Sequence, residues 1–327
     1  MISRKLWSTL ALLCLVVVAS ARADTAPEPK GITSDDGKWL LSDAEFFVKI
    51  NIKQMMASDL MTKRGITALK DAIKNNEQLK TVLEAAELDI TKDVDSIMAS
   101  GSGKSAKDAK ALVVIRGKFN QVKMQDALEK AAKNDDKLKI VKEGTTTLYE
   151  IQSGDSNMYA AFVNKNTMVL TQNKESTVAA VKDGGKKTAA LSKEMKAALG
   201  KFTGKESMSM ALVVNDELKQ MLAKVPNVSG ASKVSILTTS VTLSDAVALE
   251  IAGITGEADS AKKLSKDIGK LKALGAVLLA DNEAIPPIAT EMLEAIKINS
   301  NKEAVLLELK VTKEMIEKAT KGGGKDK

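Results

Sequence analysis

Short segments in which apolar and polar residues alternate recur along this chain, and they constrain its fold more than any other feature. In the first such segment every second residue is apolar: Ala44, Phe46, Val48, Ile50 and Ile52. A period of two places these side chains on one face of a strand, so the pattern predicts a half-buried strand. Half-buried strands are typical of antiparallel sheets with helices packed on one face. The alternation therefore predicts an α+β fold.

Helical segments separate the alternating ones, and both kinds follow the same order twice. In the first half we predict strands at residues 44–52, 94–100, 111–115, 138–141, 147–151, 158–163 and 167–171, and helices at 55–87, 124–131 and 175–182. In the second half we predict strands at 208–214, 235–243, 247–251 and 304–311, and helices at 216–223 (capped by Asn215 or Asp216), 261–278, 288–296 and 312–321 (capped by Thr312). Each half is interpreted as β-α-β-β-α-β-β-α, the first with an added hairpin and the second with an added helix. This order predicts an internal duplication; the alternative is two α+β domains that share an element order by chance.

The first 23 residues have the pattern of an export signal. Two basic residues precede an entirely apolar run at 10–19, and Ala21 and Ala23 form a small-x-small site before Asp24. Cleavage is predicted before Asp24. The apolar run is shorter than the roughly 20 residues that span a membrane; an uncleaved anchor is the alternative. We therefore expect a bacterial protein of the periplasm or the extracellular space.

Composition divides the remainder of the chain. Residues 24–41 contain proline and glycine among polar residues, which is typical of a mobile segment. The predicted divisions are a signal peptide at 1–23, a flexible lead-in at 24–41, a first α+β repeat at 42–185, a linker with a short helix at 186–205, a second α+β repeat at 206–321 and a flexible tail at 322–327.

Removal of the signal peptide would leave a chain without cysteine or histidine, because Cys14 is the only cysteine and there is no histidine. Such a chain cannot form disulfides and lacks the usual ligands of zinc, copper and haem, so no metal site and no cofactor is predicted. The formal net charge would fall from +7 to +4, because three of the 49 basic residues and none of the 42 acidic residues lie in the signal. Only Arg64 and Arg116 would remain as arginines, which argues against binding of nucleic acid.

One local motif resembles the end of a phosphate-binding loop. Residues 101–105 are Gly-Ser-Gly-Lys-Ser, but Met98 stands where the motif needs its first glycine. The motif also needs a helix directly after its lysine, whereas a strand is predicted at 111–115. We therefore interpret the motif as the loop of a β-hairpin.

Catalytic groups are scarce, and no catalytic residue is predicted. Ser260 and Lys263 have a spacing that could form a Ser/Lys pair, but the lysine is expected to face solvent and to stay protonated. Three groups of aspartates, at 35–36, 93–95 and 135–136, lack the spacing of a calcium loop. They are interpreted as solvated loop charges.

Two features could serve binding. Lysines recur on the polar faces of helices, for example in 262–270, and such faces could contact an anionic glycan, a lipid headgroup or an acidic partner. The alternative is a solubilising surface. An apolar-rich stretch at 273–280 and 285–288 could form a lid or groove, or equally a buried pair of helices.

Three segments, residues 43–51, 111–119 and 310–316, resemble a family of uncharacterised exported proteins abundant in planctomycete-type bacteria. The resemblance implies an exported α+β protein without an assigned activity, and it transfers no functional residue. We therefore expect a non-enzymatic exported protein with a binding or structural role, whose partner is a protein, a glycan or a lipid. A carrier of an apolar or lipid-like ligand is the first alternative. A hydrolase that uses carboxylates or a Ser/Lys pair is the second.

Overall fold

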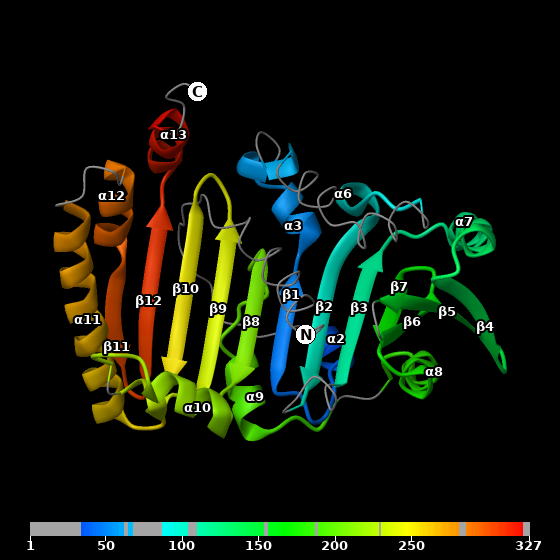
Figure 1. Cartoon of the computed structure of the whole chain (residues 1–327), viewed down its shortest axis with the longest axis horizontal. Helices are drawn as coiled ribbons and strands as arrows, with labels where there is room; N and C mark the ends of the chain where they lie inside the picture. Colours follow the sequence, from blue (N-terminus) through cyan, green and yellow to red (C-terminus); the bar gives the residue numbers. More distant parts are fainter. Residues whose placement is uncertain are drawn as a thin grey trace. The chain divides into compact units, whose positions relative to one another are not determined.

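The computed structural model describes residues 34–61, 65–67, 87–103, 110–153, 156–186, 189–228, 230–280 and 286–322. Within these ranges the chain forms two compact units (Figure 1). Unit 1 comprises residues 34–57 and 61–192, and unit 2 comprises residues 58–60 and 193–322. The division falls inside the segment 186–205 that was expected to link two halves. Each unit contains helices and an antiparallel sheet, so the predicted α+β class is confirmed.

The sheet of unit 1 contains seven strands in the order β1-β2-β3-β7-β6-β5-β4, and every neighbouring pair is antiparallel. The strands are β1 (Phe46–Ile50), β2 (Val94–Ser102), β3 (Lys110–Gly117), β4 (Leu138–Glu143), β5 (Thr146–Ser153), β6 (Ser156–Asn164) and β7 (Thr167–Thr171). The helices are α2 (Ser34–Gly37), α3 (Ile52–Met56), α6 (Ile90–Asp93), α7 (Gln121–Asn134) and α8 (Lys174–Asp183). Strand β4 lies at the edge of this sheet.

Helices lie on both faces of this sheet. Gln125 of α7 lies beside the Tyr149 side chain, and Thr177 Oγ1 of α8 lies 2.9 Å from Thr171 Oγ1. Tyr149 pairs with Ala160, whereas Thr171 pairs with the residue before it in β6. Cross-strand partners point to the same face and successive residues point to opposite faces. Helices α7 and α8 therefore cover opposite faces, whereas the prediction placed helices on one face.

Unit 2 has five strands in the order β8-β9-β10-β12-β11, again with antiparallel neighbours. The strands are β8 (Met208–Val213), β9 (Ile236–Leu243), β10 (Val247–Ile254), β11 (Lys297–Asn301) and β12 (Ala304–Val311). The helices are α9 (Lys193–Leu199), α10 (Asp216–Ala223), α11 (Ala258–Ala280), α12 (Pro287–Ala295) and α13 (Lys313–Gly322), with a 3-10 turn η2 (Ala231–Lys233).

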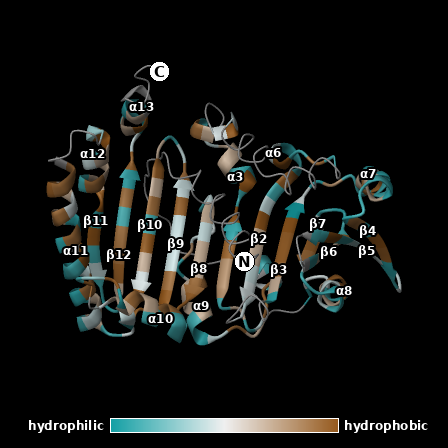
Figure 2. Cartoon of the chain, viewed as in Figure 1, coloured by the Kyte–Doolittle hydropathy of each residue, from teal (hydrophilic) through white to brown (hydrophobic). Residues whose placement is uncertain are grey.

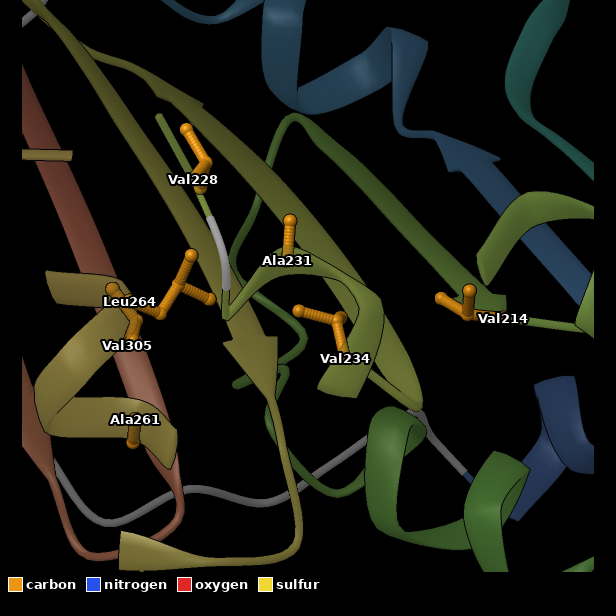
Figure 3. Close-up of a cluster of buried hydrophobic side chains, with 7 residues drawn as sticks. All are labelled: Val214, Val228, Ala231, Val234, Ala261, Leu264 and Val305. Atoms are coloured by element: carbon orange, nitrogen blue, oxygen red, sulfur yellow. The ribbon is translucent and has the colours of Figure 1, made fainter. Parts of the chain in front are cut away.

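A buried cluster joins the helices of unit 2 to its sheet (Figure 3). Its members are Val214, Val228, Ala231, Val234, Ala261, Leu264 and Val305. Leu237 of β9 and Leu307 of β12 pack against the cluster. Because Leu237 and Val305 both pair with Gly253, these side chains share one face of the sheet. Helices α10 and α11 cover that face.

Several predicted boundaries differ from the structure for local reasons. Strand β1 ends at Ile50, two residues early, because Asn51 caps α3 and accepts a hydrogen bond from Gln54 N over 3.1 Å. Most of the predicted helix at 55–87 lies outside the described residues. The predicted cap Thr312 is confirmed, since Met315 N donates to Thr312 Oγ1 over 3.3 Å. The cap of α10 is Asn215, which accepts from Leu218 N over 3.0 Å.

In unit 1 the last strand, β7, lies beside the third strand, β3, and β6 lies beyond β7. Unit 2 has the same arrangement, because β12 lies beside β10 and β11 lies beyond β12. This arrangement is the one that a duplication with an added β4–β5 hairpin would produce. The duplication itself stays a prediction.

Candidate binding site

A buried carboxylate lies at the centre of a polar cluster in unit 1. Asp36, in α2, is 1% exposed. Lys49 Nζ donates to its Oδ2 over 2.7 Å, and Arg116 Nη1 donates to its Oδ1 over 2.9 Å. Arg116 Nη2 also donates to the backbone oxygen of Asp35 over 3.1 Å. The interpretation of Asp35 and Asp36 as solvated loop charges is therefore wrong for Asp36.

Strand register explains why the two cations converge on Asp36. Lys49 of β1 pairs with Met98 of β2, and Met98 pairs with Val114 of β3. Arg116 is two residues beyond Val114, so its side chain points to the same face as that of Lys49. The segment at 34–41 crosses this face, and the ion pairs fasten it there. A buried carboxylate that accepts two charge-assisted hydrogen bonds fixes position more strongly than neutral contacts do.

An aromatic contact fastens the same segment at a second point. Trp39 is 7% exposed and lies against the backbone of Gly185. A Cβ atom on Gly185 would lie 2.6 Å from Trp39 Cε2, and the φ of Gly185 is +69°. Glycine is the residue that tolerates both the close approach and the left-handed backbone. Residues 34–41, which were expected to belong to a mobile lead-in, therefore contain a helix and a buried tryptophan.

A polar pocket lies beside these contacts, with a volume of about 390 Å³. Its lining residues come from the N-terminal segment, from the strands and from the end of α8: Asp35, Lys38, Trp39, Asp95, Arg116, Gly117, Asn164, Asn166, Thr167, Gly184 and Gly185. The volume falls within the range of small-molecule sites, about 300–1,000 Å³. Two acidic and two basic residues line it, so their formal charges cancel.

The turn between β6 and β7 forms one wall of the pocket and connects it to a second hollow. Asn166 Nδ2 donates to Gly117 O over 2.9 Å, and Asn164 Oδ1 accepts from Asn166 N over 2.9 Å. These bonds hold both amide side chains in place. Asn166 also lines a wider groove of about 660 Å³, together with Lys118, Phe119, Asn120, Gln121, Val122 and Lys165. Pocket and groove therefore meet at Asn166.

The structure places several of the residues that the sequence left open as candidates. Ser260 Oγ donates to Glu257 Oε2 over 2.9 Å, and Lys263 is exposed. Gly101 lies in β2, and strand β3 begins at Lys110, as the hairpin interpretation requires. Lys104 and Ser105 lie outside the described residues. Among the residues that the structure describes, no three carboxylates gather in a group that could hold a metal ion.

Sequence reasoning did not predict this pocket, although two signals for it were present. Asp35 and Asp36 lie a few residues before an apolar run that begins at Trp39. Arg116 is one of two arginines after the predicted signal peptide and stands at the end of a strand. Because residues 24–41 contain proline and glycine, we predicted a flexible segment there in spite of both signals.

The fold is similar to that of solved structures of one other protein. Crystal form IV of TP0453 is similar with a TM-score of 0.49 and 8% sequence identity, over 86% of this chain and 94% of that chain. Crystal form I of TP0453 has a TM-score of 0.47 and 7% identity, over 90% of this chain and 98% of that chain. The sequence matches no protein-family model, and no curated protein is significantly similar to it. The resemblance to exported proteins of planctomycete-type bacteria stays a prediction.

Proposed function

We propose that this chain is an exported, non-enzymatic binding protein whose polar pocket in unit 1 takes a hydroxyl-rich ligand such as a saccharide. The observation that carries the proposal is the convergence of Trp39, Arg116 and two asparagines on one pocket of about 390 Å³. The export signal predicted at residues 1–23 supports a location in the periplasm or at the cell surface, where glycans are present.

Charge and hydrogen-bonding capacity favour a neutral polar ligand over an ion. Arg116 is already engaged by Asp35 and Asp36, so an anionic ligand would have to compete with both. The asparagine side chains offer both donors and acceptors, and Asp95 offers acceptors. Hydroxyl groups can donate to the acceptors and accept from the donors. Uncharged hydroxyl-rich molecules therefore match the lining better than phosphate or a metal ion.

The adjoining groove favours a ligand longer than one sugar residue. It meets the pocket at Asn166, and it contains Val122, whose side chain is exposed. Val122 provides apolar surface, while Lys118 and Asn120 provide donors. A chain of two or three sugar residues would reach from the pocket into the groove.

Tryptophan fluorescence provides a direct test. In a Trp7→Phe background Trp39 is the only tryptophan of the chain, so its emission reports on the pocket wall. We expect the trisaccharide of N-acetylglucosamine, used as the probe, to change this emission saturably. Asp95→Asn should weaken the apparent affinity about tenfold, because the acceptor loses its charge. Asp126→Asn, an exposed change on α7, is the matched control and should have no effect.

Two results would contradict the proposal. One is the absence of any saturable response at millimolar saccharide, with circular dichroism showing a folded protein. The other is a response to triglycine at lower concentration than to the trisaccharide, which would assign the pocket to peptides.

A further inference from the structure

The C-terminal half of α11 in unit 2 exposes an apolar side that no part of the described chain covers. Leu274 is 54% exposed, Val277 is 58% exposed and Leu278 is 63% exposed. These residues are spaced i, i+3 and i+4, so they lie together on the helix surface. Figure 2 shows hydrophobic residues in this part of α11. We call these three residues the apolar end of α11.

The exposure is a fixed property of the helix, because neighbouring positions on α11 are anchored to the rest of unit 2. Leu264 is buried in the cluster of unit 2, and Leu271 packs against that cluster. Lys272 Nζ donates to the backbone oxygens of Glu294 and Ile296, which hold the end of α12 against α11. Helix α11 therefore cannot turn about its axis to bury the apolar end.

Lysines lie on the same side of α11, closer to its N-terminus. At 100° per residue, Lys263, Lys266 and Lys270 fall with the apolar end inside an arc of about 120°. All three lysines are exposed. Two aspartates fall in the same arc: Asp267 is buried and lies 3.4 Å from Lys270, whereas Asp259 in the first turn is exposed and lies 3.8 Å from Lys262. One side of the helix thus presents a row of positive charge that leads into three aliphatic side chains.

We propose that this side of α11 docks on an anionic lipid surface, with the apolar end in the acyl boundary and the lysines at the headgroups. Helices that lie in a membrane interface combine an apolar side with lysine or arginine in this way. The proposed contact is peripheral, with α11 lying in the interface. No helix among the described residues is long and apolar enough to cross a membrane. A second copy of the chain fits less well, because a stable interface needs about 800 Å² per partner and three aliphatic side chains expose far less. The inference does not depend on the saccharide pocket, which lies in unit 1.

A fluorescent label at the apolar end tests the contact locally, in the full chain. In a Cys14→Ser background, Leu278→Cys is labelled with bimane and mixed with vesicles of phosphatidylglycerol and phosphatidylcholine. We expect a blue shift and protection from iodide quenching. Met221→Cys is the matched control, because Met221 on α10 is 60% exposed and lies outside this side of α11. The control label should not respond, even if residues 1–23 hold the chain on the vesicle.

The lysines are tested by Lys263→Gln combined with Lys266→Gln. At the usual contribution of a lysine near an anionic surface, the apparent affinity for the vesicles should fall about thirtyfold. Lys130→Gln combined with Lys133→Gln on α7 should leave the response of the label unchanged. The proposal is overturned if the label at position 278 ignores anionic vesicles or responds equally to pure phosphatidylcholine. It is also overturned if the label shifts with protein concentration alone, which would indicate a second copy.

Discussion

Replacing Gly185 by alanine should destabilise unit 1 far more than replacing Gly144, although both glycines have a left-handed backbone. The φ of Gly185 is +69° and the φ of Gly144 is +59°. Placing an L-residue in this region costs about 1–2 kcal/mol. At Gly144 nothing lies within 4 Å of the added Cβ, so Gly144→Ala should lower the free energy of unfolding by about 1 kcal/mol.

At Gly185 a steric clash adds to the cost of the left-handed backbone. The Cβ would lie 2.6, 2.7 and 2.8 Å from three ring atoms of Trp39, where ordinary contact between carbon atoms begins at about 3.5 Å. The ring is buried, so it cannot move away without losing packing. Forcing extra atoms into a packed site costs about 1–3 kcal/mol. Gly185→Ala should therefore cost about 2–5 kcal/mol in total.

Urea unfolding followed by circular dichroism and by Trp39 fluorescence, in a Trp7→Phe background, measures both losses. Adding Trp39→Leu to Gly185→Ala removes the clash, so the double variant, followed by circular dichroism alone, should lose less than the sum of the single losses. The reasoning is refuted if Gly185→Ala and Gly144→Ala have equal effects. It is also refuted if the two single losses at positions 39 and 185 simply add.

Three further predictions follow from individual side chains. Asp36→Ala should lower the free energy of unfolding by about 2–3 kcal/mol in urea melts. Arg116 and Lys49 would lose a buried partner but stay partly hydrated. An effect below the error of the melts would contradict the ion pairs described around Asp36. Burial, and then the charge of Glu308 directly across the sheet, raise the pKa of Glu250. A carboxyl group with a raised pKa contributes stability below its unfolded pKa and loses it as the pH rises through its folded pKa. Glu250→Gln should therefore stabilise the protein by about 0.5 kcal/mol at pH 7.5, with a smaller gain in acid, and urea melts at the two pH values should reveal the sign. Leu264→Ala in the buried cluster of unit 2 should cost about 3 kcal/mol, measured as a shift of the urea midpoint; a shift matching that of an exposed leucine would exclude Leu264 from the core.

The strands could be predicted from sequence because alternation reports directly on a half-buried sheet. Strand β12 has the bounds that its pattern predicted, and β7 does as well. Strand β11 was missed because its sequence, Lys-Ile-Asn-Ser-Asn, has one apolar residue and no alternation. It lies at the edge of its sheet, where only one neighbour is needed and polar residues are tolerated.

The pocket could not be predicted because it depends on contacts between residues far apart in the chain. Asp36 and Arg116 are 80 residues apart, and Trp39 meets Gly185 after a still longer separation. The composition around Trp39 is typical of a disordered segment, but the contacts of Asp36 and Trp39 with these distant residues override that local preference. The sequence contained the partners but no information on which strand positions would face them.

The N-terminal segment links the stability of unit 1 to the proposed binding. Asp35, Lys38 and Trp39 line the pocket, so the pocket is complete only while residues 34–41 are docked. Asp36 does not line it but holds the segment through Arg116, which makes Asp36 a positioning residue. If undocking leaves a fraction of molecules without a complete pocket, the apparent affinity falls by that fraction. The same ion pairs also neutralise Arg116, so a ligand meets a polar surface of balanced charge. Docking therefore both completes the pocket and favours uncharged, hydroxyl-rich ligands.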